Sequence, residues 1–157
     1  MGQSVRPRIL IAGSYRGQVI SIAEYLSELS SQIEVLQAPD GREALALSQN
    51  QQMHLFLVDG FLKGPLNGFD LCRAIRSSGD TYRHTPIILM LSGHLITEHA
   101  RGVSAGADLL LHAPVVKEEL WRMVVLLLGA ASQSKKRQAT ASQEEIIELT
   151  PPDRVLH

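Results

Sequence analysis

The chain has 157 residues, 45% of them hydrophobic, which suits one packed domain with a tail. Its 15 basic and 16 acidic side chains nearly cancel, so it lacks the positive field that attracts nucleic acid. With Cys72 as the single cysteine, an intramolecular disulfide is excluded. No apolar run is long enough to cross a bilayer. We therefore expect a cytoplasmic protein with neither a membrane nor a nucleic-acid partner.

Short apolar runs of strand length alternate with segments whose apolar residues recur at helical spacing. In chain order the expected elements are strand 8–12, helix 19–29, strand 33–36, helix 42–49, strand 55–58, helix 69–75, strand 86–91, helix 97–105, strand 108–112 and helix 115–128. Strands without polar alternation are typical of burial on both faces, and alternation with helices favours parallel pairing. Right-handed crossovers then predict an open, doubly wound α/β sandwich of three layers.

The composition changes after the last expected helix, where Ser, Gln, Lys and Arg predominate. We therefore expect one domain over residues 5–130 and a flexible polar tail over residues 131–157. The tail contains the segment EEIIEL (144–149), in which aliphatic residues lie among acids. Two interpretations remain open for this segment: a disordered terminus, or a short docking peptide that orders on a partner.

The carboxyl ends of parallel strands are where an open sheet of this kind binds its ligands. The residues that follow the expected strands at this edge are Gly13, Ser14, Asp59, Ser92 and Ala113. An acid at the end of a buried strand is costly unless it is paired or used, and Asp59 is the one acid in such a position. Asp59 is therefore the first candidate for a functional residue.

Residues 8 to 129 resemble the receiver domains of bacterial two-component response regulators. The segments that carry the resemblance are RILIAGS, APDGREAL, HLFLVDGFLKGPLNGFDLCRAIR, TPIILMLSGH and AGADLLLHAP followed by KEEL. The resemblance implies a flavodoxin-like (βα)5 fold with a five-stranded parallel sheet of order 2-1-3-4-5. It also implies a signalling protein rather than an enzyme. A fold alone says nothing of function, so the functional prediction depends on the individual site residues.

In the family, Asp59 matches the phosphoacceptor that a histidine kinase phosphorylates, and Ser92 matches the hydroxyl that binds the phosphoryl group. The family's acidic Mg²⁺-binding pair falls at Gly13 and Ser14, and its conserved site lysine falls at Ala113. The resemblance therefore implies a degenerate variant, a pseudo-receiver. It would bind Mg²⁺ at best weakly through Asp59 and use no other cofactor. The six histidines have no helical metal-site spacing, so no metal site is expected elsewhere.

Two cations near the expected crevice offer a replacement for the lost charges. Arg16 begins the first helix and Lys63 lies in the loop after the third strand. Either one would neutralise Asp59 by forming an ion pair with it. The alternative is that both side chains point into solvent, as most surface cations do. The resemblance further implies a cis peptide bond between Ala113 and Pro114.

The last helix is apolar nearly all around, whereas a surface helix is usually apolar on one stripe. We expect Leu120, Trp121, Val124 and Leu128 to form a protein interface, with burial under the tail as the alternative. The predicted function is a stand-alone receiver-like signalling protein, impaired in phosphorylation and acting as an interaction module. The alternative is a functional phosphoacceptor modified on Asp59. The partners considered are a histidine kinase, a downstream signalling protein and a second copy of the chain.

Overall fold

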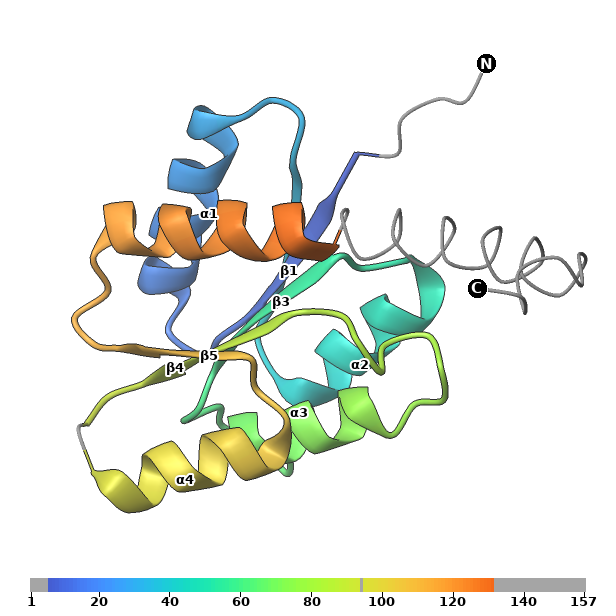
Figure 1. Cartoon of the computed structure of the whole chain (residues 1–157), viewed down its shortest axis with the longest axis vertical. Helices are drawn as coiled ribbons and strands as arrows, with labels where there is room; N and C mark the ends of the chain where they lie inside the picture. Colours follow the sequence, from blue (N-terminus) through green and yellow to red (C-terminus); the bar gives the residue numbers. More distant parts are fainter. Residues whose placement is uncertain (1–5, 94, 132–157) are drawn as a thin grey trace, which may run out of the picture.

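The structure is a computed structural model that describes residues 6–93 and 95–131, and it contains every strand and helix that the sequence predicts (Figure 1). In chain order the elements are β1 (Arg8–Ala12), α1 (Arg16–Leu29), β2 (Glu34–Ala38), α2 (Gly41–Asn50), β3 (Leu55–Asp59), α3 (Gly68–Arg76), β4 (Ile87–Leu91), α4 (Ile96–Ala105), β5 (Leu109–His112) and a last helix over residues 117–131. The last helix continues one residue into the predicted tail. The rest of that tail, including residues 144–149, lies outside the described residues.

All five strands are parallel and follow the order β2-β1-β3-β4-β5, which confirms the predicted topology. Every residue of β3 and β4 is buried, which explains why these segments carry no polar alternation. Strand β2 is different because it lies at an edge and is only partly buried. It therefore tolerates Glu34 and Gln37, and it runs two residues beyond the predicted strand.

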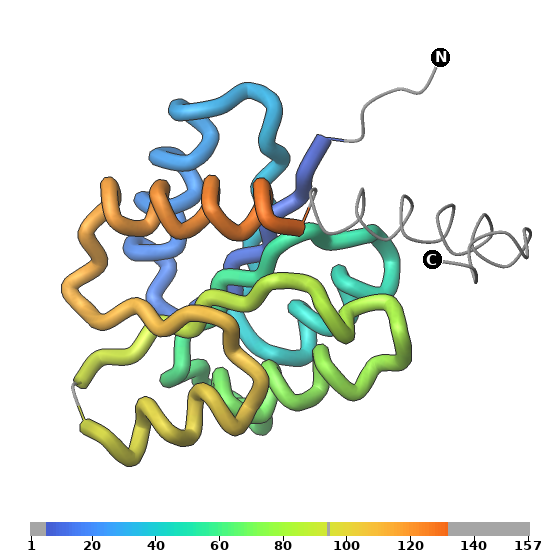
Figure 2. Tube along the Cα trace, viewed as in Figure 1, coloured from blue at the N-terminus to red at the C-terminus, as the bar shows by residue number. Residues whose placement is uncertain are grey.

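Helices cover both faces of the sheet (Figure 2). The molecule therefore has two apolar cores, one on each face. Successive strand residues point to opposite faces. Ile9 and Ile11 of β1 therefore pack with α1 and the last helix, whereas Leu10 packs with the layer formed by α2, α3 and α4. No helix within the described residues is long and apolar enough to cross a membrane.

Side-chain caps fix the starts of two helices next to the carboxyl edge of the sheet. The Asp40 carboxylate accepts a hydrogen bond from the amide of Glu43 at 2.9 Å, which caps α2. The Asn67 side chain accepts one from the amide of Asp70 at 2.9 Å, which caps α3. These bonds satisfy amides that have no partner inside the helix. They also hold the loops that surround Asp59.

Candidate functional site

Asp59 is the last residue of β3 and lies in the middle of the sheet, in register with Met90 of β4. Its side chain is buried at 8% exposure, and one carboxylate oxygen accepts a hydrogen bond from the amide of Phe61 at 2.9 Å. This bond turns the chain directly after the strand. The structure therefore places the predicted phosphoacceptor at the carboxyl edge, under the loop that follows it.

Two glycines allow this loop to return close to the strand. The amide of Gly60 donates to the Met90 carbonyl at 2.8 Å, and the amide of Gly68 donates to the Gly60 carbonyl at 3.1 Å. A Cβ atom on Gly68 would collide with the Asp59 carbonyl oxygen, which is a backbone atom and has no room to move aside. Glycine at position 68 is thus required for α3 to begin beside Asp59.

Ser14, at one of the two positions where the family has metal-binding acids, connects three loops. Its hydroxyl accepts a hydrogen bond from the amide of Lys63 at 2.8 Å and donates to the Pro39 carbonyl at 3.4 Å. The loops after β1, β2 and β3 therefore meet at this hydroxyl. The Ser14 hydroxyl therefore already uses its single donor and one of its acceptor positions within the protein.

Gly13 lies at the other position where the family has an acid, and it borders Asp59. A Cβ atom there would lie 4.0 Å from the Asp59 Cβ but only 2.6 Å from the Val19 Cγ2, which is too close for unmoved neighbours. Its amide donates to the Ala38 carbonyl at 3.0 Å. Any side chain at position 13 would therefore have to displace Val19, a core residue of α1.

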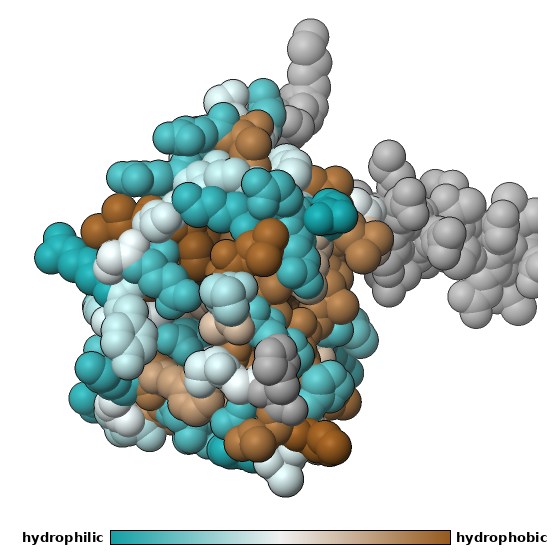
Figure 3. Space-filling model, turned by 90° about the vertical axis from the view of Figure 1, so that its left-hand side faces the viewer, coloured by the Kyte–Doolittle hydropathy of each residue, from teal (hydrophilic) through white to brown (hydrophobic). Residues whose placement is uncertain are grey.

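The other two predicted positions also lie at this edge. Ser92 follows β4 and is exposed, and Ala113 follows β5 and is partly buried. The Ala113 amide donates to the Leu91 carbonyl at 2.7 Å, and its peptide bond to Pro114 is cis, as predicted. The methyl group of Ala113 brings no charge to the site. Figure 3 faces this edge and shows hydrophobic and hydrophilic surface side by side.

The predicted ion pair with Asp59 is not formed by either cation within the described residues. The Lys63 Nζ lies over the Tyr15 ring instead, 5.2 Å from its centroid. Arg16 is exposed and lines a cavity beside the loop after β1. Lys63 is directed away from Asp59 by its contact with Tyr15, and Arg16 stays exposed to solvent. Both cations remain at the rim.

The donor set is a poor fit for Mg²⁺, the ion that the fold family implies. In proteins Mg²⁺ takes near-octahedral oxygen coordination, usually with one or two carboxylates and with waters or phosphates in the other positions. Asp59 offers one carboxylate, Gly13 has no side chain, and the Ser14 hydroxyl is neutral and already hydrogen-bonded. Across the described part of the chain, no three His, Cys, Asp or Glu side chains come together in a group that could hold a metal ion.

The predicted interface on the last helix is partly wrong. Leu120 and Val124 are fully buried and belong to the core that α1 shares, and Trp121 and Leu128 are partly buried against it. Leu126, at 63% exposure, is the most exposed large apolar residue of this helix. The sequence did not reveal the inward face because apolar residues surround the helix.

Cys72 lies on the buried face of α3. Burial raises the pKa of its thiol to about 12, against the smaller opposing effect of Arg76 and Arg73. A thiol with this pKa stays protonated at neutral pH and is a poor nucleophile. It has no chemical role at the site.

Sequence reasoning missed Tyr15, Pro39 and Phe61 as parts of the site. Tyr15 and Phe61 are exposed on the loops after β1 and β3, and Pro39 provides the carbonyl that Ser14 contacts. The available signal was position, since each residue lies one to three places after a strand. These residues complete the rim around Asp59.

The family model described as "Response regulator receiver domain" matches residues 9–125. The chain belongs to this family. The receiver domain takes part in two-component signal transduction, and its fold and the place of Asp59 agree with that membership.

Among curated relatives, this receiver is similar to response regulator MprA of Mycolicibacterium vanbaalenii, with 31% identity over 148 residues. That alignment covers 94% of this chain and 62% of the relative, so the chain spans less than two thirds of the relative's length. A CheY-like receiver protein from Methanospirillum hungatei superposes with a TM-score of 0.73 at 22% identity, covering 82% of this chain and 98% of its own. The Francisella response regulator 1452 receiver domain superposes with a TM-score of 0.71 at 24% identity. That match covers 80% of this chain and 98% of the Francisella domain. At these identities the structural likeness concerns the fold alone.

Proposed function

We propose that this receiver is impaired in phosphorylation and serves two-component signalling as a protein-interaction module. The observation that carries the proposal is that the Ser14 hydroxyl is hydrogen-bonded to Pro39 and Lys63 within the protein. Where the family has an acidic metal ligand, a neutral hydroxyl ties the loops after β2 and β3 together. In this proposal, the hydrogen bonds of Ser14 hold these loops where the family has a metal ligand.

Charge explains why this replacement would impair phosphoryl transfer. The transferred group carries negative charge, and catalysis of the transfer depends on positioning and on neutralising that charge. Asp59 has no cationic partner among the described residues, and Ala113 offers none. Loss of a metal-site group typically costs ~10–100-fold in metal affinity or activity. Mg²⁺ would bind at best weakly through Asp59, and no other cofactor is proposed.

The interaction surface that we propose is the exposed side of the last helix, where Val125 and Leu126 are 50% and 63% exposed. This helix and α4 flank the edge strand β5 on opposite faces of the sheet (Figure 1). Exposed apolar residues at such a place are typical of a protein-binding surface. The proposed partner is a histidine kinase, a downstream signalling protein or a second copy of the chain.

The test is mass spectrometry of the intact protein after incubation with acetyl phosphate and Mg²⁺. We expect no added phosphate on the wild-type chain. The matched positive control is Ser14→Asp combined with Ala113→Lys, which returns one acid and the lysine while sparing the crowded position 13. We expect this variant to gain phosphate on Asp59, and addition of Asp59→Asn to abolish the gain.

The alternative function, a phosphoacceptor modified on Asp59, predicts the opposite result for the wild-type chain. Phosphate that appears on the wild type and disappears in Asp59→Asn would contradict our proposal. The phosphoacceptor alternative is favoured by the two family positions that the chain retains, Asp59 and Ser92. Circular dichroism of each variant shows that a negative result comes from a folded protein.

A further inference from the structure

A cavity of about 340 Å³ lies between the carboxyl ends of β1 and β2 and the start of α1. This volume falls within the range of small-molecule sites. The cavity is adjacent to the Asp59 site. The two share Gly13 and Ser14, and the other lining residues belong to the cavity alone. Its lining consists of Gly13, Ser14, Arg16, Val19, Gln37, Ala38 and Pro39.

The interior of the cavity is apolar and its polar groups are few. Val19 and Ala38 are both buried, at 5% and 1% exposure, and provide apolar surface together with Pro39. Ser14, Gln37 and Arg16 contribute one hydroxyl, one amide and one guanidinium. An apolar interior with a few convergent polar groups is the usual composition of a small-molecule site.

Among the described residues that line the cavity, Arg16 is the only ionisable one. Its guanidinium forms no hydrogen bond, ion pair or ring contact that involves a described residue. Two acids at the same edge of the sheet, Asp40 and Asp59, have their carboxylates engaged by other groups. The Asp40 carboxylate caps α2, and the Asp59 carboxylate accepts from the Phe61 amide. Within the described part of the chain, the positive charge of Arg16 therefore has no counterion.

We infer that this cavity binds a small organic carboxylate with an apolar body. The guanidinium fork of Arg16 matches the two oxygens of a carboxylate, and the apolar part of the ligand would contact Val19 and Ala38. The Ser14 hydroxyl lies at the boundary between the cavity and the loop of Lys63. A ligand in the cavity would thus touch the residue that holds the loop over Asp59. This site goes beyond the proposed function, and it does not depend on phosphorylation.

The test uses hexanoate as the probe and 1-hexanol as its uncharged counterpart, titrated into the 157-residue chain labelled with ¹⁵N. We expect hexanoate to shift the amide signals of Gly13, Ser14, Val19 and Ala38. Hexanol should require a concentration about 10-fold higher, because it lacks the charge-assisted bonds to Arg16. Arg16→Gln should weaken hexanoate binding about 10-fold and leave hexanol binding unchanged.

The matched control is Arg122→Gln, which removes an exposed arginine of the last helix, far along the chain from the cavity lining. It should leave hexanoate binding unchanged. The inference is overturned if hexanoate shifts none of these amides or if hexanol binds as well as hexanoate. Equal weakening by Arg16→Gln and Arg122→Gln would overturn it too, because general charge attraction would then explain the binding.

Discussion

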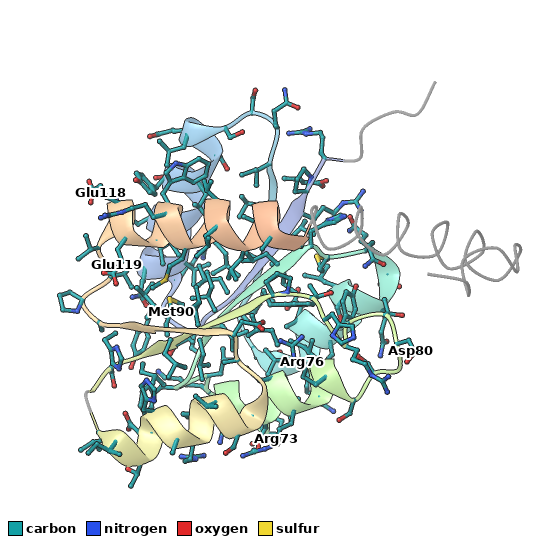
Figure 4. The ribbon with its side chains drawn as sticks, in the orientation of Figure 1. Arg73, Arg76, Asp80, Met90, Glu118 and Glu119 are labelled. Atoms are coloured by element: carbon teal, nitrogen blue, oxygen red, sulfur yellow. The ribbon has the colours of Figure 1, made fainter. Side chains whose placement is uncertain are left out.

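Arg76, at the end of α3, joins segments that are far apart in the sequence (Figure 4). Its guanidinium donates to the Gly106 carbonyl at 2.7 and 3.0 Å and to the Tyr82 carbonyl at 3.0 Å. It also pairs with the Asp108 carboxylate at 2.7 Å, whose same oxygen accepts from the Ile87 amide at 2.8 Å. The side chain is only 18% exposed. This fork fixes α3, α4 and the starts of β4 and β5 relative to one another.

Arg76→Lys keeps the charge but replaces the fork by a single nitrogen, which leaves some of these acceptors without a donor. We expect the free energy of unfolding to fall by about 1–3 kcal/mol, measured by urea denaturation. The control is Arg73→Lys, because Arg73 pairs with Asp70 in a half-exposed i,i+3 contact. That change should cost less than about 0.5 kcal/mol. Equal losses in the two variants would contradict the role assigned to Arg76.

At the scale of single residues, the sequence placed Asp59, Ser92, Gly13, Ser14 and Ala113 correctly at one edge of the sheet. This succeeded because parallel strands end on the same side, so chain position alone brings these residues together. The partner of Asp59 was not predictable in this way. Side-chain partners depend on loop geometry, and the loop after β3 directs Lys63 towards Tyr15.

Among the elements, the last helix shows how burial differs from hydrophobicity. Leu120 and Val124 face the sheet and are fully buried, whereas Val125 and Leu126 lie on the exposed side. Helical spacing makes residues four apart share a face, which accounts for the first pair. The sequence offered several equivalent apolar faces, and only the position of the helix against β5 and α1 selected one.

Leu120→Ala removes a buried side chain from the core and should lower the free energy of unfolding by about 2–5 kcal/mol. Leu126→Ala removes a side chain exposed to solvent and should change it by less than about 0.5 kcal/mol. Chemical denaturation of the two variants measures the difference. If Leu126→Ala were as destabilising as Leu120→Ala, the assignment of an exposed and a buried face would be wrong.

Strand boundaries followed from sequence most accurately where the apolar run is uninterrupted. β1 was predicted without error, and β3, β4 and β5 each differed by one residue. β2 was predicted too early and too short, since Glu34 and Gln37 interrupt its apolar run. An edge strand keeps one side open to solvent, and its polar residues obscure the pattern.

In the whole molecule, we expect the middle of the sheet to be the most stable part and the two edge strands to be less stable. β1, β3 and β4 each pair on both sides, and their residues are buried apart from Arg8. β2 and β5 pair on one side only and are partly exposed. Amides that open only when the whole domain unfolds should therefore lie in the three central strands.

We expect native-state hydrogen exchange to be slowest for the amides of β1, β3 and β4, with free energies of opening close to that of global unfolding. The amides of β2 and β5 should exchange faster, because edge strands separate without opening the sheet centre. Exchange measured by NMR at several low denaturant concentrations resolves the two groups. Equal protection of all five strands would contradict this order.

The sequence by itself determined the layers and the residues at the carboxyl edge, because these follow from local periodicity and chain connectivity. The strand order came from the resemblance to the receiver family. The tertiary structure decided the inward face of the last helix, the connection of three loops through Ser14, and the cavity next to Arg16. These features depend on atoms from segments far apart in the chain. Their distances are set by packing, which no local pattern in the sequence encodes.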